Sequence, residues 1–292
     1  AKPSSWGWGL AVDQNRNGVQ LAQCFVALAA CTGSFDVPGG TSLGIPSDLV
    51  PNFVSSGVFH GAMSKETLDK RVGYKEYPFV TMQLDVAHPD RMLEVLETDD
   101  PYPIRMAAIL NSNFLSPTCS AEPKRHHDVL QEKMEFVMAL ELFQNPTTMA
   151  LADLILPVAS FAEFDSYVAP NYGLQAPFIG AINKAIEVGE ARSEIQVSLE
   201  MIQLLNPDAL PCEPNDIAWL DTYMPEKIGS FKNLQEHVFF QPGEEYYKYE
   251  SGHLRPDGEP GFFTPTGRIE LWSTLYSQYG DDPLPYYLEP KY

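Results

Sequence analysis

The chain has 292 residues, of which 44% are hydrophobic and 12% aromatic, enough to bury one substantial core or two smaller ones. It carries 19 basic and 39 acidic side chains, a net charge of −20, so its surface repels phosphate backbones and anionic lipids. This balance argues against nucleic-acid binding and against a basic membrane anchor. No run of apolar residues in the sequence is long enough to insert into a membrane as a spanning helix.

The four cysteines are widely separated, at positions 24, 31, 119 and 212, and no two form a Cys-x-x-Cys pair. This spacing argues against a zinc site or an iron–sulfur cluster held by the chain itself. The adjacent histidines His126 and His127 lie among charged residues and are expected to be solvated. We therefore predict no metal ligands in this chain.

The first predicted helix is Gly18–Thr32, a run of good helix formers that Gly33 is expected to end. The Pro-Gly-Gly sequence within residues 36–40 predicts a tight turn, and residues 41–62 are expected to be irregular. Pro89 predicts the start of a further helix, since proline is favoured at the first helical position.

Short apolar strands then alternate with helices. Strands are expected at residues 104–110, 136–140 and 154–156, and helices at 123–132 and 146–152. This alternation predicts an α/β fold with a largely parallel sheet flanked by helices, in Rossmann-like layers. Ligands of such sheets bind beyond the carboxyl ends of the strands, where the Asn111–Asn113 turn and the Phe143–Thr148 loop are expected.

Three more helices are predicted, over residues 193–205, 216–223 and 230–237. The tail from Phe239 is rich in Tyr, Gly and Pro and shows little periodicity, so we expect it to be irregular and to wrap around the rest. The predicted division is an α/β region over residues 1–205, then linker helices and a tail over 206–292.

Neither of the glycine-rich nucleotide-binding motifs, G-x-G-x-x-G and G-x-x-x-x-G-K-[ST], occurs in the sequence. A binding site must therefore be predicted from other residues. Thr147 and Thr148 lie at a predicted helix N-terminus, whose N–H groups and dipole suit a phosphate or a pterin carbonyl. The Asp153 carboxylate could accept two parallel N–H bonds from an amino-pyrimidinone edge. The alternative is that Thr147 only caps the helix and Asp153 is a solvated turn residue.

Residues 145–163 resemble a motif of the molybdopterin oxidoreductases, the dimethyl-sulfoxide-reductase-like family: Thr-x-Thr-Ala-x-x-Ala-Asp-x-x-Leu-Pro, followed by a Glu that Glu163 matches. Four further segments resemble motifs of that family in the same order along the chain: residues 13–20, 32–40, 189–194 and 261–272. One segment departs from the pattern, since the usual Gly-x-Asn-Pro after the central strand appears as Asn111-Ser-Asn-Phe114.

The resemblance implies that this region binds one pterin guanine dinucleotide of a bis-cofactor molybdenum or tungsten site. Gly39 and Gly40 would then let the backbone approach the cofactor closely. The cofactor contacts implied by the resemblance are Gln14, Asn17, Gly18, Asn113, Thr147, Thr148 and Asp153.

In that family the metal ligand and any iron–sulfur cysteines precede the segment matching residues 13–20, and a final β-barrel domain follows the segment matching 261–272. The resemblance therefore implies an inactive fragment whose partners are the remaining domains of the same polypeptide and, as in many relatives, an iron–sulfur electron-transfer subunit. A complete protein would support two-electron redox or oxygen-atom-transfer chemistry. The alternative is a non-catalytic scaffold of the same fold, without metal, in an electron-transfer complex. Substrate and compartment are left open.

Overall fold

The computed structural model describes residues 3–7, 9, 12, 15–43, 64–78, 87–116, 122–168, 179–222, 224–240 and 245–289. The chain divides into two compact units. One combines residues 1–50, 169–179 and 240–292, and the other combines 51–168 with 180–239. Residues on both sides of the predicted division after Leu205 lie in the second unit. In the described part, no helix has the length and apolar character that crossing a bilayer requires.

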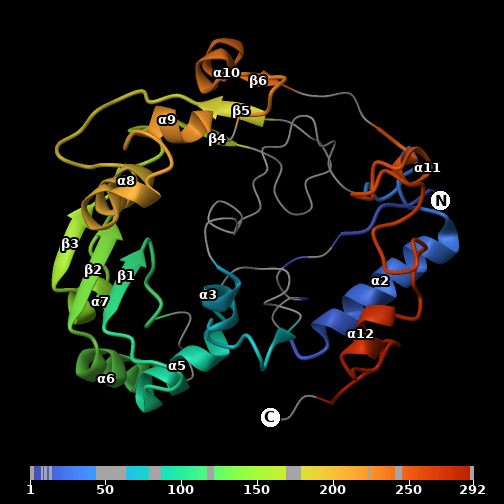
Figure 1. Ribbon diagram of the computed structural model, residues 1–292, viewed down its shortest axis with the longest axis horizontal. Helices are drawn as coiled ribbons and strands as arrows, with labels where there is room; N and C mark the ends of the chain where they lie inside the picture. Colours follow the sequence, from blue (N-terminus) through green and yellow to red (C-terminus); the bar gives the residue numbers. More distant parts are fainter. Residues whose placement is uncertain are drawn as a thin grey trace. The chain divides into compact units, whose positions relative to one another are not determined.

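A parallel sheet organises the second unit. Its strands are β1 (Met106–Leu110), β2 (Phe136–Glu141) and β3 (Leu154–Pro157), in the order β1-β2-β3. Leu140 of β2 pairs with Leu110 on one side and with Leu156 on the other, so all three carboxyl ends meet at one edge. Figure 1 shows the three arrowheads at the same end of the sheet, next to α8. The predicted parallel sheet flanked by helices is confirmed.

Both faces of the sheet are covered, which explains the continuous apolar run of β2. Val137 and Ala139 face a cluster that includes Leu151, and Met138 and Leu140 face the opposite cluster. Full burial of such a side chain stabilises the fold by about 1.5–3 kcal/mol. The covering helices are α6 (Pro123–Lys133) and α7 (Pro146–Leu151) on the first face and α8 (Glu194–Leu205) on the second.

Three helices of this unit begin at a residue whose side chain caps the helix N-terminus. Ser193, Asn215 and Ser230 each accept, through the side-chain oxygen, the N–H three residues later, which satisfies one donor left open at a helix start. The other described elements of the unit are α3 (Lys65–Asp69), α5 (Pro89–Thr98), η1 (Pro207–Ala209), α9 (Asp216–Asp221) and α10 (Phe231–His237).

A second, small sheet is absent from the sequence prediction. Strand β4 (Ser166–Val168) pairs antiparallel with β5 (Ile179–Ile182), and β6 (Phe239–Phe240) lies beside β5. Strands of two to four residues leave too little alternation for a periodicity argument, so they were not expected.

The first unit contains α2 (Gly18–Thr32), α11 (Lys248–Ser251) and α12 (Thr274–Gln278). Gly33 ends α2 in the left-handed conformation (φ 63°), as predicted. The tail, which was expected to be irregular, includes the two short helices α11 and α12. Near the end of the tail, the backbone of Leu288 exchanges hydrogen bonds with the side chain of Asn17.

Candidate functional site

The loop that follows β1 is joined to the last residues of β2 and to the start of α8, at the carboxyl edge of the parallel sheet. Asn111 takes a positive φ of 45° and donates its N–H to Leu140 O at 3.0 Å. The next N–H, of Ser112, donates to Glu141 Oε1 at 2.5 Å, and the Asn111 amide donates to the Glu194 carboxylate at the start of α8. The predicted position of the Asn111–Asn113 turn at this edge is confirmed.

Two of the predicted contact residues, Asn113 and Thr147, are brought together at this edge. Asn113 Oδ1 accepts from Thr147 N at 3.2 Å and from Thr147 Oγ1 at 3.0 Å. The same hydroxyl accepts from Leu115 N at 3.1 Å. Thr147 is fully buried, so these bonds fix the loop after β1 onto the start of α7.

Thr148 is also fully buried and forms a capping box with Asn145. Thr148 N donates to Asn145 Oδ1 at 3.1 Å, and Thr148 Oγ1 accepts from Asn145 N at 3.1 Å. The N–H groups and hydroxyls of Thr147 and Thr148 thus already bond within the chain. A phosphate at this helix start would have to displace Asn113 or Asn145, and direct contacts from the two threonines stay a prediction.

Asp153 is not brought together with these residues. It directly precedes β3 and so lies at the amino edge of the sheet, across the length of α7 from Asn113. Its Oδ2 accepts from Val137 N at 2.7 Å, and its own N–H donates to Val137 O at 2.8 Å. This geometry gives Asp153 a role in pairing β2 with β3, and its contact with a cofactor stays a prediction.

The remaining predicted contacts belong to the first unit. Gln14 lies outside the described residues. The Asn17 amide exchanges two hydrogen bonds of 2.8 Å with the backbone of Leu288, and Gly18 is the buried first residue of α2. Gly40 has an internal reason to lack a side chain, because a Cβ would lie 2.3 Å from Ser34 O.

Glu141 is a functional candidate that the sequence prediction missed. It ends β2 at the carboxyl edge and is only 9% exposed, yet only one of its carboxylate oxygens has a partner among the described residues. Its place at the end of an apolar strand was a usable signal, since ligands of a parallel sheet bind at the carboxyl ends of its strands.

The loop after Glu141 offers donors and an aromatic face. The N–H groups of Leu142, Phe143 and Gln144 make no hydrogen bond within the described part of the chain. The Phe143 ring is 82% exposed, which is unusual for a large apolar side chain. The edge therefore combines an acceptor, three successive backbone donors and a stacking surface.

Glu163, the residue that matches the last position of the family motif, is a structural acceptor in this chain. Its Oε2 accepts from Ser160 N at 2.9 Å and from Ser160 Oγ at 2.7 Å. These two bonds stabilise the carboxylate form and hold the pKa of Glu163 below its ordinary value. They close the loop after β3.

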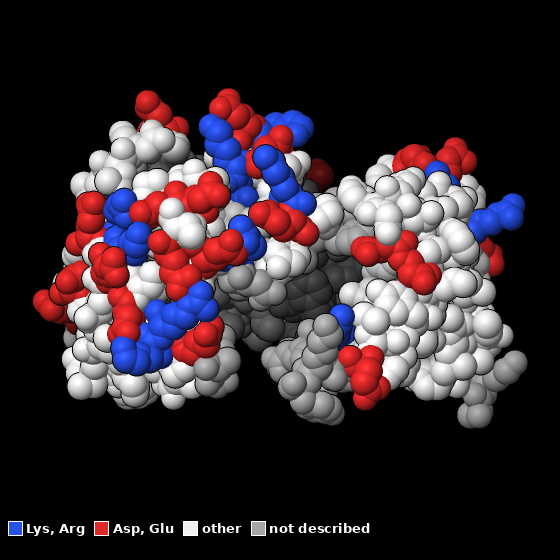
Figure 2. Space-filling model, turned by 90° about the horizontal axis from the view of Figure 1, so that it is seen from below, with Lys and Arg blue, Asp and Glu red and all other residues white. Residues whose placement is uncertain are grey.

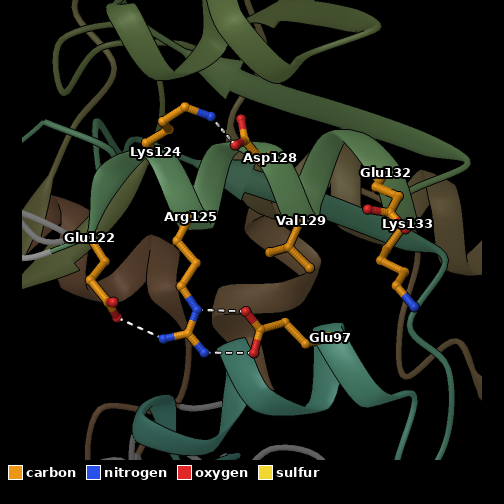
Figure 3. Close-up of a pocket in the computed structure, with 8 residues that line it drawn as sticks. All are labelled: Glu97, Glu122, Lys124, Arg125, Asp128, Val129, Glu132 and Lys133. Carbon is orange, nitrogen blue, oxygen red and sulfur yellow. Dashed lines mark hydrogen bonds and ion pairs between the residues drawn. The ribbon is translucent and has the colours of Figure 1, made fainter.

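A cavity of about 570 Å³ lies away from this edge, between α5 and α6. Figure 3 shows the Arg125 side chain extending toward α5. Its Nε and one terminal nitrogen each donate to the Glu97 carboxylate at 2.6 Å, and the other terminal nitrogen donates to Glu122 at 2.9 Å. The hydrogen bonds to Glu97 raise the pKa of Arg125. Because the Arg125 guanidinium already pairs with two carboxylates, it is not available to bind an anionic ligand. We therefore assign no binding site to this cavity.

The charged side chains form a mixed surface. Figure 2 shows acidic and basic groups interspersed on the left-hand part of the face drawn and fewer charged groups on the right-hand part. Within the described ranges, no group of three or more His, Cys, Asp or Glu side chains is arranged to hold a metal ion.

No protein-family model matches the chain. Acetylene hydratase of Syntrophotalea acetylenica is 27% identical over 318 residues, covering 99% of this chain and 40% of the relative. Dopamine dehydroxylase of Eggerthella lenta is 26% identical over 354 residues, covering 96% and 34%. The solved structure of acetylene hydratase from Pelobacter acetylenicus matches with a TM-score of 0.81 and 25% identity, over 99% of this chain and 41% of that one.

The chain is thus similar in sequence to two enzymes, and its fold matches that of acetylene hydratase. The chain spans 40% or less of the length of the two curated relatives.

Proposed function

We propose that this chain is the part of a molybdopterin oxidoreductase that binds a pterin guanine dinucleotide, with the guanine at the carboxyl edge of the parallel sheet. The observation that carries the proposal is the buried Glu141 carboxylate at that edge, beside the N–H groups of residues 142–144, which make no hydrogen bond to any residue that the structure describes. The similarity to acetylene hydratase and dopamine dehydroxylase over nearly the whole chain supports it. So does the order of the five sequence segments that resemble that family.

The donors and acceptors at this edge fit a guanine. A guanine presents an N–H and an amino group side by side, and a carboxylate accepts two such bonds in parallel. Glu141 supplies that acceptor. The N–H groups of residues 142–144 and the Asn113 amide, whose nitrogen has no partner within the described residues, would donate to the carbonyl or to phosphate oxygens. The exposed ring of Phe143 would stack on the base.

Asp153 is the competing carboxylate, since the family resemblance implies it as a contact. Only one of the two acids can read the guanine, because they lie at opposite edges of the sheet. We favour Glu141, because it lies at the ligand edge and its second oxygen accepts no hydrogen bond from the part of the chain that the structure describes.

When bound, the cofactor would supply a metal centre for two-electron redox or oxygen-atom transfer. The residues of this chain would hold and orient its nucleotide end and exclude water from it. The named relatives act on acetylene and on dopamine, so the similarity does not select a substrate.

The proposal is tested by titrating the chain with GMP and with AMP, following the signals of the carboxyl-edge loops by NMR. We expect GMP to bind more tightly than AMP, and Glu141→Gln to weaken GMP binding by about tenfold, equivalent to about 1.4 kcal/mol. Asp153→Asn is the matched control, since it also removes one carboxylate.

Three results would count against the proposal. Equal affinity for GMP and AMP would remove guanine recognition, and the absence of binding by either nucleotide would remove the site. A loss of GMP affinity in Asp153→Asn but not in Glu141→Gln would move the site to the amino edge.

A further inference from the structure

The loop after β1 has an unusual backbone conformation at its first residue. Asn111 has a φ of 45°, in the left-handed region that residues with a Cβ seldom adopt. The family motif that this segment resembles has a glycine here, for which the conformation carries no steric cost. Asparagine is one of the few other residues that adopt it, because its short polar side chain can form a hydrogen bond. In this chain the Asn111 amide donates that bond to the Glu194 carboxylate.

Glu194 reaches this loop from an element with its own anchors. It is the first residue of α8, directly after the buried capping residue Ser193, whose hydroxyl accepts from Gln196 N at 3.0 Å. Val197 of the same helix packs against the buried cluster on that face of the sheet. The start of α8 is therefore held in place without Asn111, so Glu194 can act as a fixed acceptor for the loop.

The conformation of Asn111 directs the next N–H of the loop. Ser112 N donates to Glu141 Oε1 at 2.5 Å, and no described residue donates to the other oxygen of Glu141. The peptide plane between Asn111 and Ser112 is rigid, so a change in the backbone at Asn111 would turn this N–H away. Glu141 would then lose the bond that orients its carboxylate. Asn113 is held separately by Thr147, so it should keep its place.

We infer that Glu194 is a positioning residue for guanine recognition. By accepting the bond from Asn111, it keeps the Ser112 N–H directed at Glu141. This inference rests on the proposed function, in which Glu141 accepts from the guanine. Glu194 has no assigned contact with the nucleotide. It governs the choice between guanine and adenine, because adenine lacks the adjacent N–H and amino donors that an oriented carboxylate accepts in parallel.

The titrations with GMP and AMP test this role in variants of Glu194. Glu194→Ala should weaken GMP binding about fivefold and AMP binding by less than about twofold. Glu194→Gln keeps a side-chain oxygen that can accept from Asn111, and should retain most of the affinity for GMP. Glu187→Ala is the matched control, since it removes an exposed carboxylate of the same unit and should leave both affinities unchanged.

A glycine at position 111 separates positioning from a direct effect of the Glu194 charge. Asn111→Gly allows the left-handed conformation without a side-chain hydrogen bond, so Glu194→Ala should have little further effect in that background. An equal loss of GMP affinity in both backgrounds would overturn the inference. So would an equal loss in Glu194→Gln and Glu194→Ala, or tighter GMP binding when the carboxylate is removed.

Amide hydrogen exchange of Ser112 without nucleotide distinguishes failure of the inference from failure of the proposed function. We expect the Ser112 N–H to exchange about fivefold faster in Glu194→Ala and at nearly the original rate in Glu194→Gln. Unchanged exchange in Glu194→Ala would overturn the inference, whatever the nucleotide does. Faster exchange in a chain that binds neither nucleotide would refute the proposed function and the guanine role of Glu194, and would leave only its contact with the loop.

Discussion

The carboxylate of Asp36 and the ammonium of Lys248 form an ion pair in which neither side chain is more than 2% exposed. Asp36 Oδ2 also accepts from Lys248 N at 2.6 Å, and its backbone O accepts from Tyr247 N at 2.7 Å. The ammonium has a further acceptor, Glu245 O at 2.8 Å. These bonds join the glycine-rich turn after α2 to the start of α11, more than 200 residues later in the sequence.

Removing one partner of this pair should destabilise the first unit strongly. Lys248→Met leaves a buried carboxylate without its counter-charge, and we expect a loss of about 3–5 kcal/mol in the free energy of unfolding by urea. Lys184→Met is the control, since it removes an exposed pair with Glu187 and should cost no more than about 1 kcal/mol. Similar losses in the two variants would mean that the buried pair contributes little.

The hydroxyl of Thr147 should matter for stability without any cofactor. Thr147→Val keeps the shape of the side chain but leaves Leu115 N without its acceptor, at a cost of about 1–3 kcal/mol in the free energy of unfolding. Thr98→Val removes an exposed hydroxyl at the end of α5 and should change the stability by less than about 0.5 kcal/mol. If Thr147→Val were as stable as the unchanged chain, the hydrogen bonds of this hydroxyl would contribute little to the fold.

Gly40 should resist substitution more than Gly33. An added Cβ at Gly40 would collide with Ser34 O, whereas at Gly33 it would meet open space and only the strain of a positive φ, about 1 kcal/mol. We therefore expect Gly40→Ala to lower the thermal midpoint of the first unit well below that of Gly33→Ala. If Gly33→Ala lowered the thermal midpoint more than Gly40→Ala, contact with Ser34 O would not explain the glycine at position 40. Close approach of a ligand would then be the better explanation.

Asp216 provides a test by pH. Burial raises the pKa of Asp216 above the ordinary aspartate value, and the nearby charge of Asp165 also raises it. The hydrogen bond from Ser193 lowers it, but by less than burial raises it. A raised carboxyl pKa means that the folded chain binds the proton more tightly than the unfolded one. The stability it contributes is complete below the ordinary value and is lost as the pH rises through the folded pKa.

We expect Asp216→Asn to lack that loss, because the amide stays neutral. The difference in unfolding free energy, unchanged chain minus variant, should fall as the pH rises from about 3 to 7. Urea titrations at several pH values measure it. A difference that grows with pH would show that the carboxylate is better stabilised in the fold than in water.

The parallel sheet was predictable because its strands are apolar on both faces and its helices begin at recognisable residues. Pro89, Pro123 and Pro146 each begin a helix where the sequence predicted one, and Gly33 ends α2. These signals are local, so they do not depend on how distant segments pack.

The binding edge was only partly predictable. The turn at Asn111–Asn113 follows from strand ends, but the bond from Asn113 to Thr147 spans 34 residues and depends on tertiary packing. Asp153 was assigned through the family motif, and the parallel register places it at the amino edge, where a linear motif gives no warning. Glu141 was missed because a single acid at the end of a strand belongs to no recognisable motif.

The pterin and metal content of the complete polypeptide, purified from its natural source, tests the proposed function most directly. We expect pterin guanine dinucleotide, identified by mass spectrometry after release, together with molybdenum or tungsten in stoichiometric amounts. A folded complete polypeptide that contains neither pterin nor either metal would contradict the proposal and favour a non-catalytic scaffold.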